Sequence, residues 1–153
     1  MAKSYKNTIT RVCCYKGAET EEIAEHTKVD MKKRRVPHTA IIHGGSNNLR
    51  HKRPVKEIVN DTSVAAMQLQ AQGVKNIAIS SVTPRFGLKD KITQLNNDLK
   101  KLCQELNISY INNSDIKYNL HISDWDYTHL NHQGVKKLQS NFASYIKSCE
   151  RKE

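Results

Sequence analysis

Short runs of β-branched and aromatic residues alternate with longer segments of helical periodicity, and this alternation limits the fold more than any other feature. The runs that predict strands are residues 9–15, 39–43, 77–82 and 108–111. The segments that predict helices begin near Ala18 and Pro54 and, later in the chain, place apolar stripes over residues 92–106 and 135–149. Strands separated by helices of ten or more residues predict a mainly parallel sheet with helices on both faces. Without a linker or repeat, we expect one domain over residues 1–153.

Polar and glycine-containing loops follow these strands. Gly17 follows the first strand, the loop Gly44–Asn48 the second and Thr83–Arg85 the third. An irregular polar stretch leads from the fourth strand to Asp126 and His129, just ahead of the last helix. Because ligands bind at the carboxyl ends of strands in open parallel sheets, these loops predict a functional edge.

Asp126 and His129 have the spacing of a catalytic base and the residue that orients it. A carboxylate three residues before an imidazole, within one polar turn, can fix the tautomer and the orientation of the ring. The alternative is that this stretch only begins the last helix, with Asp126 or Asn131 as the N-cap. His43, at the end of an apolar strand, is interpreted as a hydrogen-bonded core histidine, and Arg85 as a surface arginine.

The formal net charge of +10 favours a polyanionic partner such as nucleic acid. The residues that would make such contacts form two clusters, Lys32, Lys33, Arg34 and Arg35 in the first and Arg50, Lys52 and Arg53 in the second. The alternative is a set of solvated loops and helix faces, and no recognised nucleic-acid motif is present.

Metal sites and membrane spans are not indicated by the sequence. The cysteines Cys13, Cys14, Cys103 and Cys149 show no metal-ligand spacing and are interpreted as reduced and structural. We therefore predict no metal and no cofactor. No apolar run approaches the length of a membrane helix, and the first residues lack the apolar core of a signal peptide. An intracellular location, cytoplasmic or nuclear, is expected, whereas nothing indicates the oligomeric state.

Taken together, the loops resemble the sequence blocks of the SGNH (GDSL-type) hydrolases. Gly17 matches the glycine of the second block, and Asn47 in the Gly45–Asn48 run takes the place of the asparagine of the third. The stretch from Asp126 to His129 matches the Asp-x-x-His of the fifth block, and residues 130–134 resemble its continuation. The resemblance implies a three-layer α/β/α, flavodoxin-like fold. In finer pattern, Thr83–Arg85 and residues 95–103 are similar to esterase-like domains of retrotransposon-derived animal proteins.

The resemblance is incomplete at the start of the chain. The first block, Gly-Asp-Ser with its preceding apolar strand, is absent, and only eight residues precede the strand at Ile9. Ser4 has neither the strand nor a Gly-Asp before it, so we assign no nucleophile. We therefore expect an N-terminally truncated domain whose sheet lacks the first strand. Asn48, in place of the aspartate of the third block, is a smaller departure.

The resemblance also implies a chemistry, acyl transfer on carboxylic esters. It implies His129 as the base, Asp126 as its orienter, and Gly17 and Asn47 as the oxyanion-hole donors. Without a nucleophilic serine we expect an impaired or inactive relative of the serine esterases, and whether the chain is an enzyme is left open. Its possible substrate is a small ester. The alternative is a non-catalytic basic module that binds nucleic acid or another acidic partner.

Overall fold

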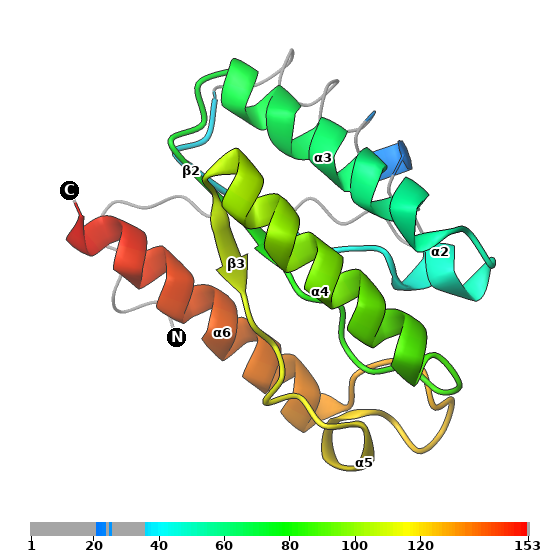
Figure 1. Ribbon diagram of the computed structural model, residues 1–153. Helices are drawn as coiled ribbons and strands as arrows, with labels where there is room; N and C mark the ends of the chain where they lie inside the picture. The colour runs from blue at the N-terminus through cyan, green and yellow to red at the C-terminus, as the bar shows by residue number, and fades with distance from the viewer. Residues whose placement is uncertain (1–20, 24, 26–35, 153) are drawn as a thin grey trace.

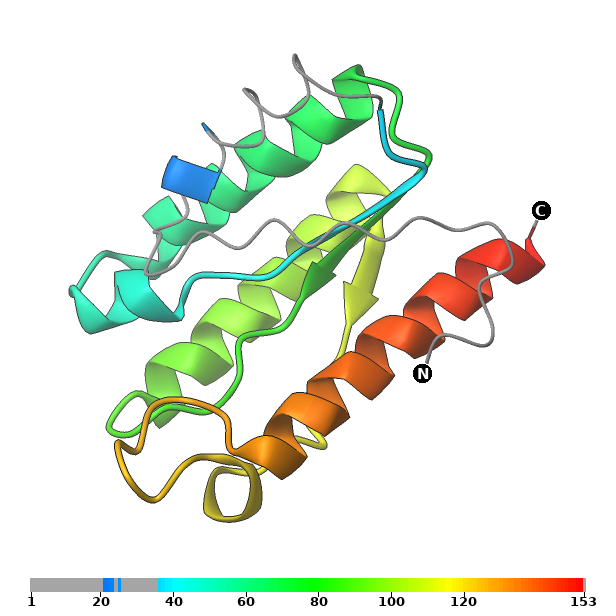
Figure 2. The same ribbon diagram turned by 180° about the vertical axis from the view of Figure 1, so that it is seen from behind.

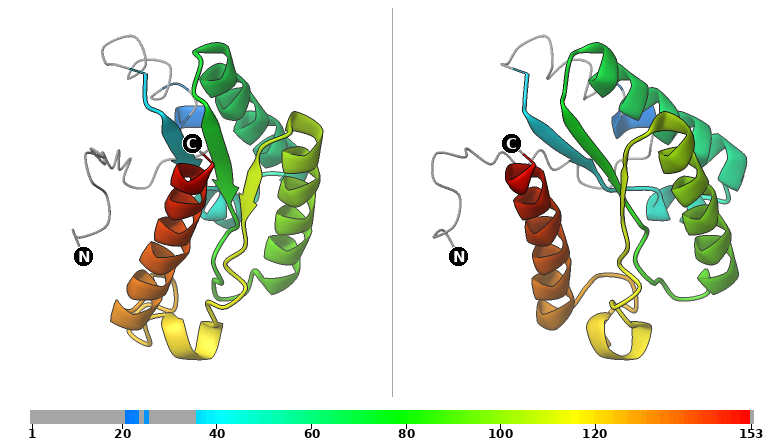
Figure 3. Two further views of the ribbon diagram at one scale, coloured as in Figure 1. Left: turned by 90° about the vertical axis from the view of Figure 1, so that its left-hand side faces the viewer. Right: turned by 60° about the vertical axis from the view of Figure 1, so that its left-hand side comes forward.

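The computed structural model describes residues 21–23, 25 and 36–152. Three parallel strands, β1 (Thr39–Ile42), β2 (Asn76–Ser80) and β3 (Ser109–Ile111), form a sheet in the order β1-β2-β3. The helices α3 (Val55–Ala71) and α4 (Lys89–Leu106) cover one face of this sheet, and α6 (His132–Arg151) lies on the other (Figures 1 and 3). The predicted parallel α/β/α architecture is therefore confirmed.

The central strand β2 shows why the sheet needs two covering layers. Its residues Ile77, Ala78 and Ile79 are all at most 4% exposed, and they form a continuous apolar run rather than an alternating one. Such a run is typical of a strand buried on both faces. On one side β2 pairs with β1, with Asn76 opposite Thr39. On the other side it pairs with β3, with Ser80 opposite Ile111.

The core lies mainly between the sheet and the two helices α3 and α4. Ile58 of α3 and Leu95 and Leu99 of α4 are at most 1% exposed. The stripe over residues 92–106 is buried as its periodicity predicts. On the opposite face α6 buries only Gly134 and Cys149 fully, and the rest of its apolar stripe is partly exposed.

Two short helices differ from the predictions. Residues 46–48 were expected in a loop, but they begin α2 (Ser46–Arg50), because Leu49 turns into the core and is 1% exposed. The stretch after β3, expected to be irregular, contains α5 (Tyr118–His121). The predicted strand at residues 9–15 and most of the first predicted helix lie outside the described residues, although residues 21–23 are helical.

Cys103 and Cys149 are buried free thiols, which confirms that they are reduced and structural. Burial raises the pKa of the Cys103 thiol to about 11, so this group stays protonated and unreactive. Within residues 21–23, 25 and 36–152, no helix is both long and apolar enough to cross a membrane.

Candidate functional site

The carboxyl ends of the strands bring together segments that are far apart in the sequence. Figure 2 shows α2, the loop between β2 and α4, and the loop between α5 and α6 at the same end of the sheet. These three segments carry Asn47, Arg85, and Asp126 with His129, respectively. The edge that the sequence predicts as functional is therefore formed by the expected loops.

Asp126 and His129 are bonded to each other within one turn. The Nδ1 atom of His129 lies 2.5 Å from Oδ2 of Asp126. The second oxygen, Oδ1, accepts hydrogen bonds from the backbone N–H groups of Thr128 (3.0 Å) and His129 (3.1 Å). The imidazole is 82% exposed and the carboxylate 30% exposed, so the ring faces solvent while the carboxylate is held beneath it.

These contacts lower the pKa of the Asp126 carboxyl to about 2. The hydrogen bond with His129 is the largest cause, followed by the two backbone N–H donors. All three favour the ionised form of Asp126. The left-handed backbone of Tyr127, with a φ of 57°, closes the turn, and its N–H donates to the carbonyl of Ser123 (2.9 Å). The turn therefore holds a carboxylate against His129 Nδ1 without help from distant residues.

The continuation after His129 attaches this turn to α6. Asn131, not Asp126, is the N-cap: its Oδ1 accepts from the N–H of Gly134 (2.9 Å), and its Nδ2 donates to the carbonyl of Leu120 (2.9 Å). Gly134 packs directly on α5, because a Cβ there would lie 2.3 Å from the carbonyl oxygen of His121. Capping by Asn131 and pairing of Asp126 with His129 thus occur side by side, and the sequence alternatives do not exclude each other.

Asn47 lies in the first turn of α2 and is bonded to Arg85. One guanidinium nitrogen of Arg85, Nη1, donates both to Oδ1 of Asn47 (3.1 Å) and to Oγ of Ser46 (3.2 Å). Gly45 makes the turn into α2 with a φ of +111°, a conformation that residues other than glycine rarely adopt. Arg85, interpreted from the sequence as a surface arginine in a loop of this edge, is partly buried and bonded to Asn47.

The loop that carries Arg85 and Phe86 contacts both halves of the site. The pKa of Arg85 is lowered by burial and by the nearby charge of Arg50, whereas Asp126 acts in the opposite direction. The next residue, Phe86, donates its backbone N–H to the carbonyl of Tyr127 (3.3 Å), and the two rings lie 6.2 Å apart. The only advance signal for this residue was its place directly after a strand, in a Pro-Arg pair at the carboxyl edge.

A second histidine contacts a serine nearby, but that serine is buried. His43 Nδ1 lies 2.9 Å from Oγ of Ser80, which also accepts from Nδ2 of Asn113 (2.7 Å). His43 is therefore hydrogen-bonded as predicted, but its residue surface is exposed and it is not part of the core. The imidazole contacts the edge of the Phe142 ring as well. Ser80 is 1% exposed, and a substrate carbonyl cannot approach a hydroxyl in that position. This pair is a structural network rather than a nucleophile and its base.

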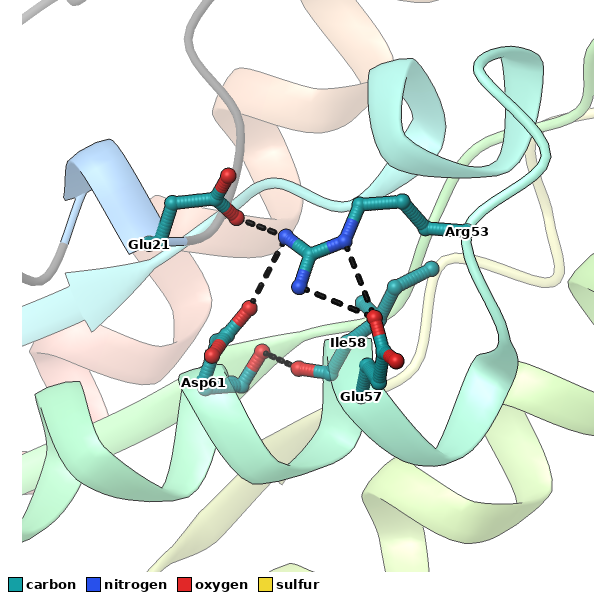
Figure 4. Close-up of polar contacts among 6 residues, drawn as sticks. Glu21, Arg53, Glu57, Ile58 and Asp61 are labelled. Carbon is teal, nitrogen blue, oxygen red and sulfur yellow. Dashed lines mark hydrogen bonds and ion pairs between the residues drawn. The ribbon is translucent and has the colours of Figure 1, made fainter.

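Arg53 is surrounded by carboxylates. Figure 4 shows its guanidinium pointing to Glu21, to Glu57 (3.1 Å) and to Asp61 (3.1 Å). These three acids offset its charge locally, so Arg53 contributes little to a cationic surface. The contacts instead connect the residues that follow α2 to α3 and to the helical residues 21–23.

Several predicted site residues lie outside the described part of the chain. These residues are Gly17 and the cluster Lys32, Lys33, Arg34 and Arg35. Their predicted roles therefore stay predictions. Among the residues that the structure does describe, no three His, Cys, Asp or Glu side chains are grouped as metal ligands would be.

Comparison of the sequence with family models and with curated proteins finds no match. Comparison of the structure finds similar solved structures. A family 3 carbohydrate esterase from Clostridium thermocellum superposes with a TM-score of 0.74 and 20% identity, over 88% of this chain and 68% of that one. A G-D-S-L family protein from Desulfitobacterium hafniense gives 0.73 and 12%, over 84% and 76%. An acetylxylan esterase from Geobacillus stearothermophilus gives 0.71 and 14%, over 85% and 68%.

Variants of the Geobacillus enzyme identify the kind of residues on which it depends. Its catalytic mutants replace a serine, an aspartate and a histidine, and the last two are three positions apart. At identities of 12–20% the likeness establishes the fold and not the activity. The chain described here has the α/β fold of the SGNH (G-D-S-L-type) esterases.

Proposed function

We propose that the edge formed by Asn47, Asp126 and His129 is a carboxylic-ester hydrolase site of the acyl-transfer type. The observation that carries the proposal is the 2.5 Å contact between Asp126 Oδ2 and His129 Nδ1, beneath an imidazole that is 82% exposed. A carboxylate on one ring nitrogen leaves the other free to take a proton, which is the arrangement of a general base and its orienter.

The proposed roles follow from the donors at the edge. Nε2 of His129 takes the proton from the water that attacks the ester carbonyl, and Asp126 stabilises the imidazolium that forms. The amide Nδ2 of Asn47, with the backbone N–H of Gly17 as a second donor, stabilises the oxyanion of the tetrahedral intermediate. Loss of one such donor typically costs about 2.7–4 kcal/mol in transition-state stabilisation.

We propose that turnover by these 153 residues is slow, because they contain no Gly-Asp-Ser block. Removal of a catalytic serine costs roughly 10⁶-fold in kcat in subtilisin, and a residual catalysis of about 10³–10⁴-fold over water comes from substrate binding and the oxyanion hole. We propose that these 153 residues by themselves act as an impaired esterase, in which water activated by His129 takes the place of a serine hydroxyl.

The proposed substrates are esters of short acyl groups, above all acetyl esters. The support is the named activity of one neighbour, the Geobacillus enzyme, which is described as an esterase of acetylxylan and of acetyl-xylooligosaccharides. Three exposed aromatic side chains flank the site on the same loops: Phe86 is 71%, Trp125 90% and Tyr127 54% exposed. They offer apolar surface to the part of a substrate that lies beyond the acyl group.

The test is hydrolysis of p-nitrophenyl acetate by the wild-type chain beside His129→Ala and Asn47→Ala. We expect a slow rate above the spontaneous one, and a fall towards background in the Asn47 and His129 variants. Lys147→Ala, a change on the outer face of α6, is the matched control and is expected to behave as wild type. A rate that is insensitive to both site variants, or no rate above background, would contradict the proposal.

The second candidate function is a non-catalytic module that binds nucleic acid, and it is favoured by the net charge of +10. It would use Lys32, Lys33, Arg34 and Arg35 together with Arg50 and Lys52, whereas Arg53 is offset by its three acids. Binding through phosphates weakens steeply as salt is raised. A titration with single-stranded RNA at about 50 mM and 200 mM salt should therefore show loss of affinity of several orders of magnitude, and affinity that does not change with salt would exclude this candidate.

A further inference from the structure

Arg85 lies in the loop that contacts both halves of the edge, and it has no role in the chemistry proposed above. We infer that Arg85 is a positioning residue: it holds the side-chain amide of Asn47 with the oxygen turned inward and the NH₂ group turned towards the site. The inference rests on the proposed function, because Asn47 Nδ2 is there the donor to the oxyanion.

The orientation of the amide follows from hydrogen-bond chemistry. A guanidinium group only donates hydrogen bonds, so the amide atom that faces Arg85 Nη1 at 3.1 Å must be the carbonyl oxygen of Asn47. The NH₂ group then lies in the same plane but on the other side of the Cβ–Cγ bond axis. If the amide were free to rotate by 180°, the oxygen would face the site half of the time and would repel a developing oxyanion rather than bind it.

The loop that carries Arg85 is anchored on both sides. On the near side, Asn96 of α4 satisfies both backbone groups of Val82: its Oδ1 accepts from the N–H (2.7 Å), and its Nδ2 donates to the carbonyl (3.0 Å). On the far side, Phe86 donates to the carbonyl of Tyr127 in the turn of Asp126. The backbone that carries the Arg85 side chain is therefore held in place on both sides. A residue that aligns another side chain needs such a fixed backbone.

Arginine suits this position better than a simple cation. One nitrogen with two hydrogens reaches Ser46 and Asn47 together, and the planar group is pre-organised for such a paired contact. Arg50 and Asp126 lie near enough to influence its charge in opposite directions. The same side chain therefore aligns the Asn47 amide through a hydrogen bond and interacts with the charge of the Asp126 carboxylate.

The experiment measures the order of the Asn47 side-chain amide by ¹⁵N NMR relaxation, with its signals assigned by their absence in Asn47→Asp. In the wild type we expect an order parameter typical of a rigid group, about 0.8, and in Arg85→Met a fall below about 0.6, the range of flexible groups. Arg50→Met removes a neighbouring charge without removing a hydrogen bond to Asn47, and is expected to leave the amide ordered. If Arg85→Met does not fold, Arg85→Lys, which keeps the charge on a differently shaped donor, supplies the same comparison.

An Asn47 amide that is equally ordered with and without Arg85, or that loosens equally in Arg50→Met, would overturn the inference. Where ester hydrolysis is measurable, Arg85→Met should lower kcat by at least about 10-fold and leave KM nearly unchanged, because a misaligned donor weakens only the transition state. An ordered, Arg85-dependent amide in a chain without His129-dependent hydrolysis would contradict the proposed function and leave the positioning role of Arg85 intact.

Discussion

The two halves of the candidate site are held in place by different means. In the Asp126 turn, residues 123–131, the contacts are local: both oxygens of Asp126 are bonded within three residues, and the N–H of Ser123 donates to the carbonyl of His129 (2.8 Å). In α2, the side chain of Asn47 is held by Arg85, which follows it by 38 positions in the chain. The first half is defined by its own sequence, whereas the second depends on how the rest of the chain folds.

The difference predicts how each half responds to mutation. A local turn needs only to be attached correctly to its helix, so its weak point is the junction with α6. The α2 half needs both a special backbone at its start and a distant side chain, so damage to either should misplace Asn47.

The largest effect is expected for Gly134→Ala, at the junction of the Asp126 turn with α6. The added Cβ would lie 2.3 Å from the carbonyl oxygen of His121, a backbone atom that cannot simply rotate away. Although alanine is the better helix former, we expect a net loss of roughly 2–3 kcal/mol in the free energy of unfolding, in the upper range for overpacked sites. Urea denaturation measures it, and a variant as stable as wild type would show that α5 and α6 do not pack as described.

Gly45→Ala tests the backbone that begins α2. With a φ of +111° and neighbours Ile58 and Leu95 at 3.4 Å from the added Cβ, we expect a loss of about 1–2 kcal/mol, chiefly from backbone strain. Gly87→Ala is the matched control, because its φ is also positive, +74°, and nothing lies within 4 Å of an added Cβ. The same denaturation curves should rank Gly45→Ala as the more destabilising variant, and the reverse order would argue against close packing at the start of α2.

Arg53→Met tests the ion pairs that follow α2. Although three carboxylates surround the guanidinium, Glu21 and Glu57 are about half exposed, at 51% and 55%. Solvent therefore screens the pairs, and we expect a loss of at most about 1 kcal/mol that shrinks when salt is added. Unfolding at two salt concentrations checks this, and a large loss that is independent of salt would mean that Arg53 acts through packing rather than charge.

The smallest effect on stability is expected from the titration of Asp126. Its folded-state pKa of about 2 is below the ordinary value of 3.8, so folding favours the ionised form. The stabilisation from this group is present above about pH 4 and is lost as the pH falls towards 2. In Asp126→Asn this component is absent, so the difference in unfolding free energy between the two chains should narrow over that range. A difference that stays constant from pH 5 to about pH 2 would contradict the lowered pKa.

The contrast between local and long-range contacts also explains which features could be predicted from the sequence. The order of the three strands and the three long helices from residue 39 onward follows from apolar periodicity, and the contact of Asp126 with His129 follows from a spacing of three. The contact of Arg85 with Asn47 could not be predicted, because no local pattern encodes a hydrogen bond between two loops. Helix α2 was mistaken for a loop because Gly-Ser-Asn-Asn is typical of turns, and the burial of Leu49, a tertiary effect, decides otherwise.

The proposed chemistry depends above all on Asp126 holding the His129 ring in the tautomer that a base requires. The most direct measurement is the tautomer of His129 from long-range ¹H–¹⁵N correlation spectra, taken at a pH where the ring is neutral, in the wild type and in Asp126→Asn. We expect a protonated Nδ1 and an unprotonated Nε2 in the wild type, and loss of this preference in Asp126→Asn. A wild-type ring protonated on Nε2, or a tautomer that does not change with Asp126, would contradict it.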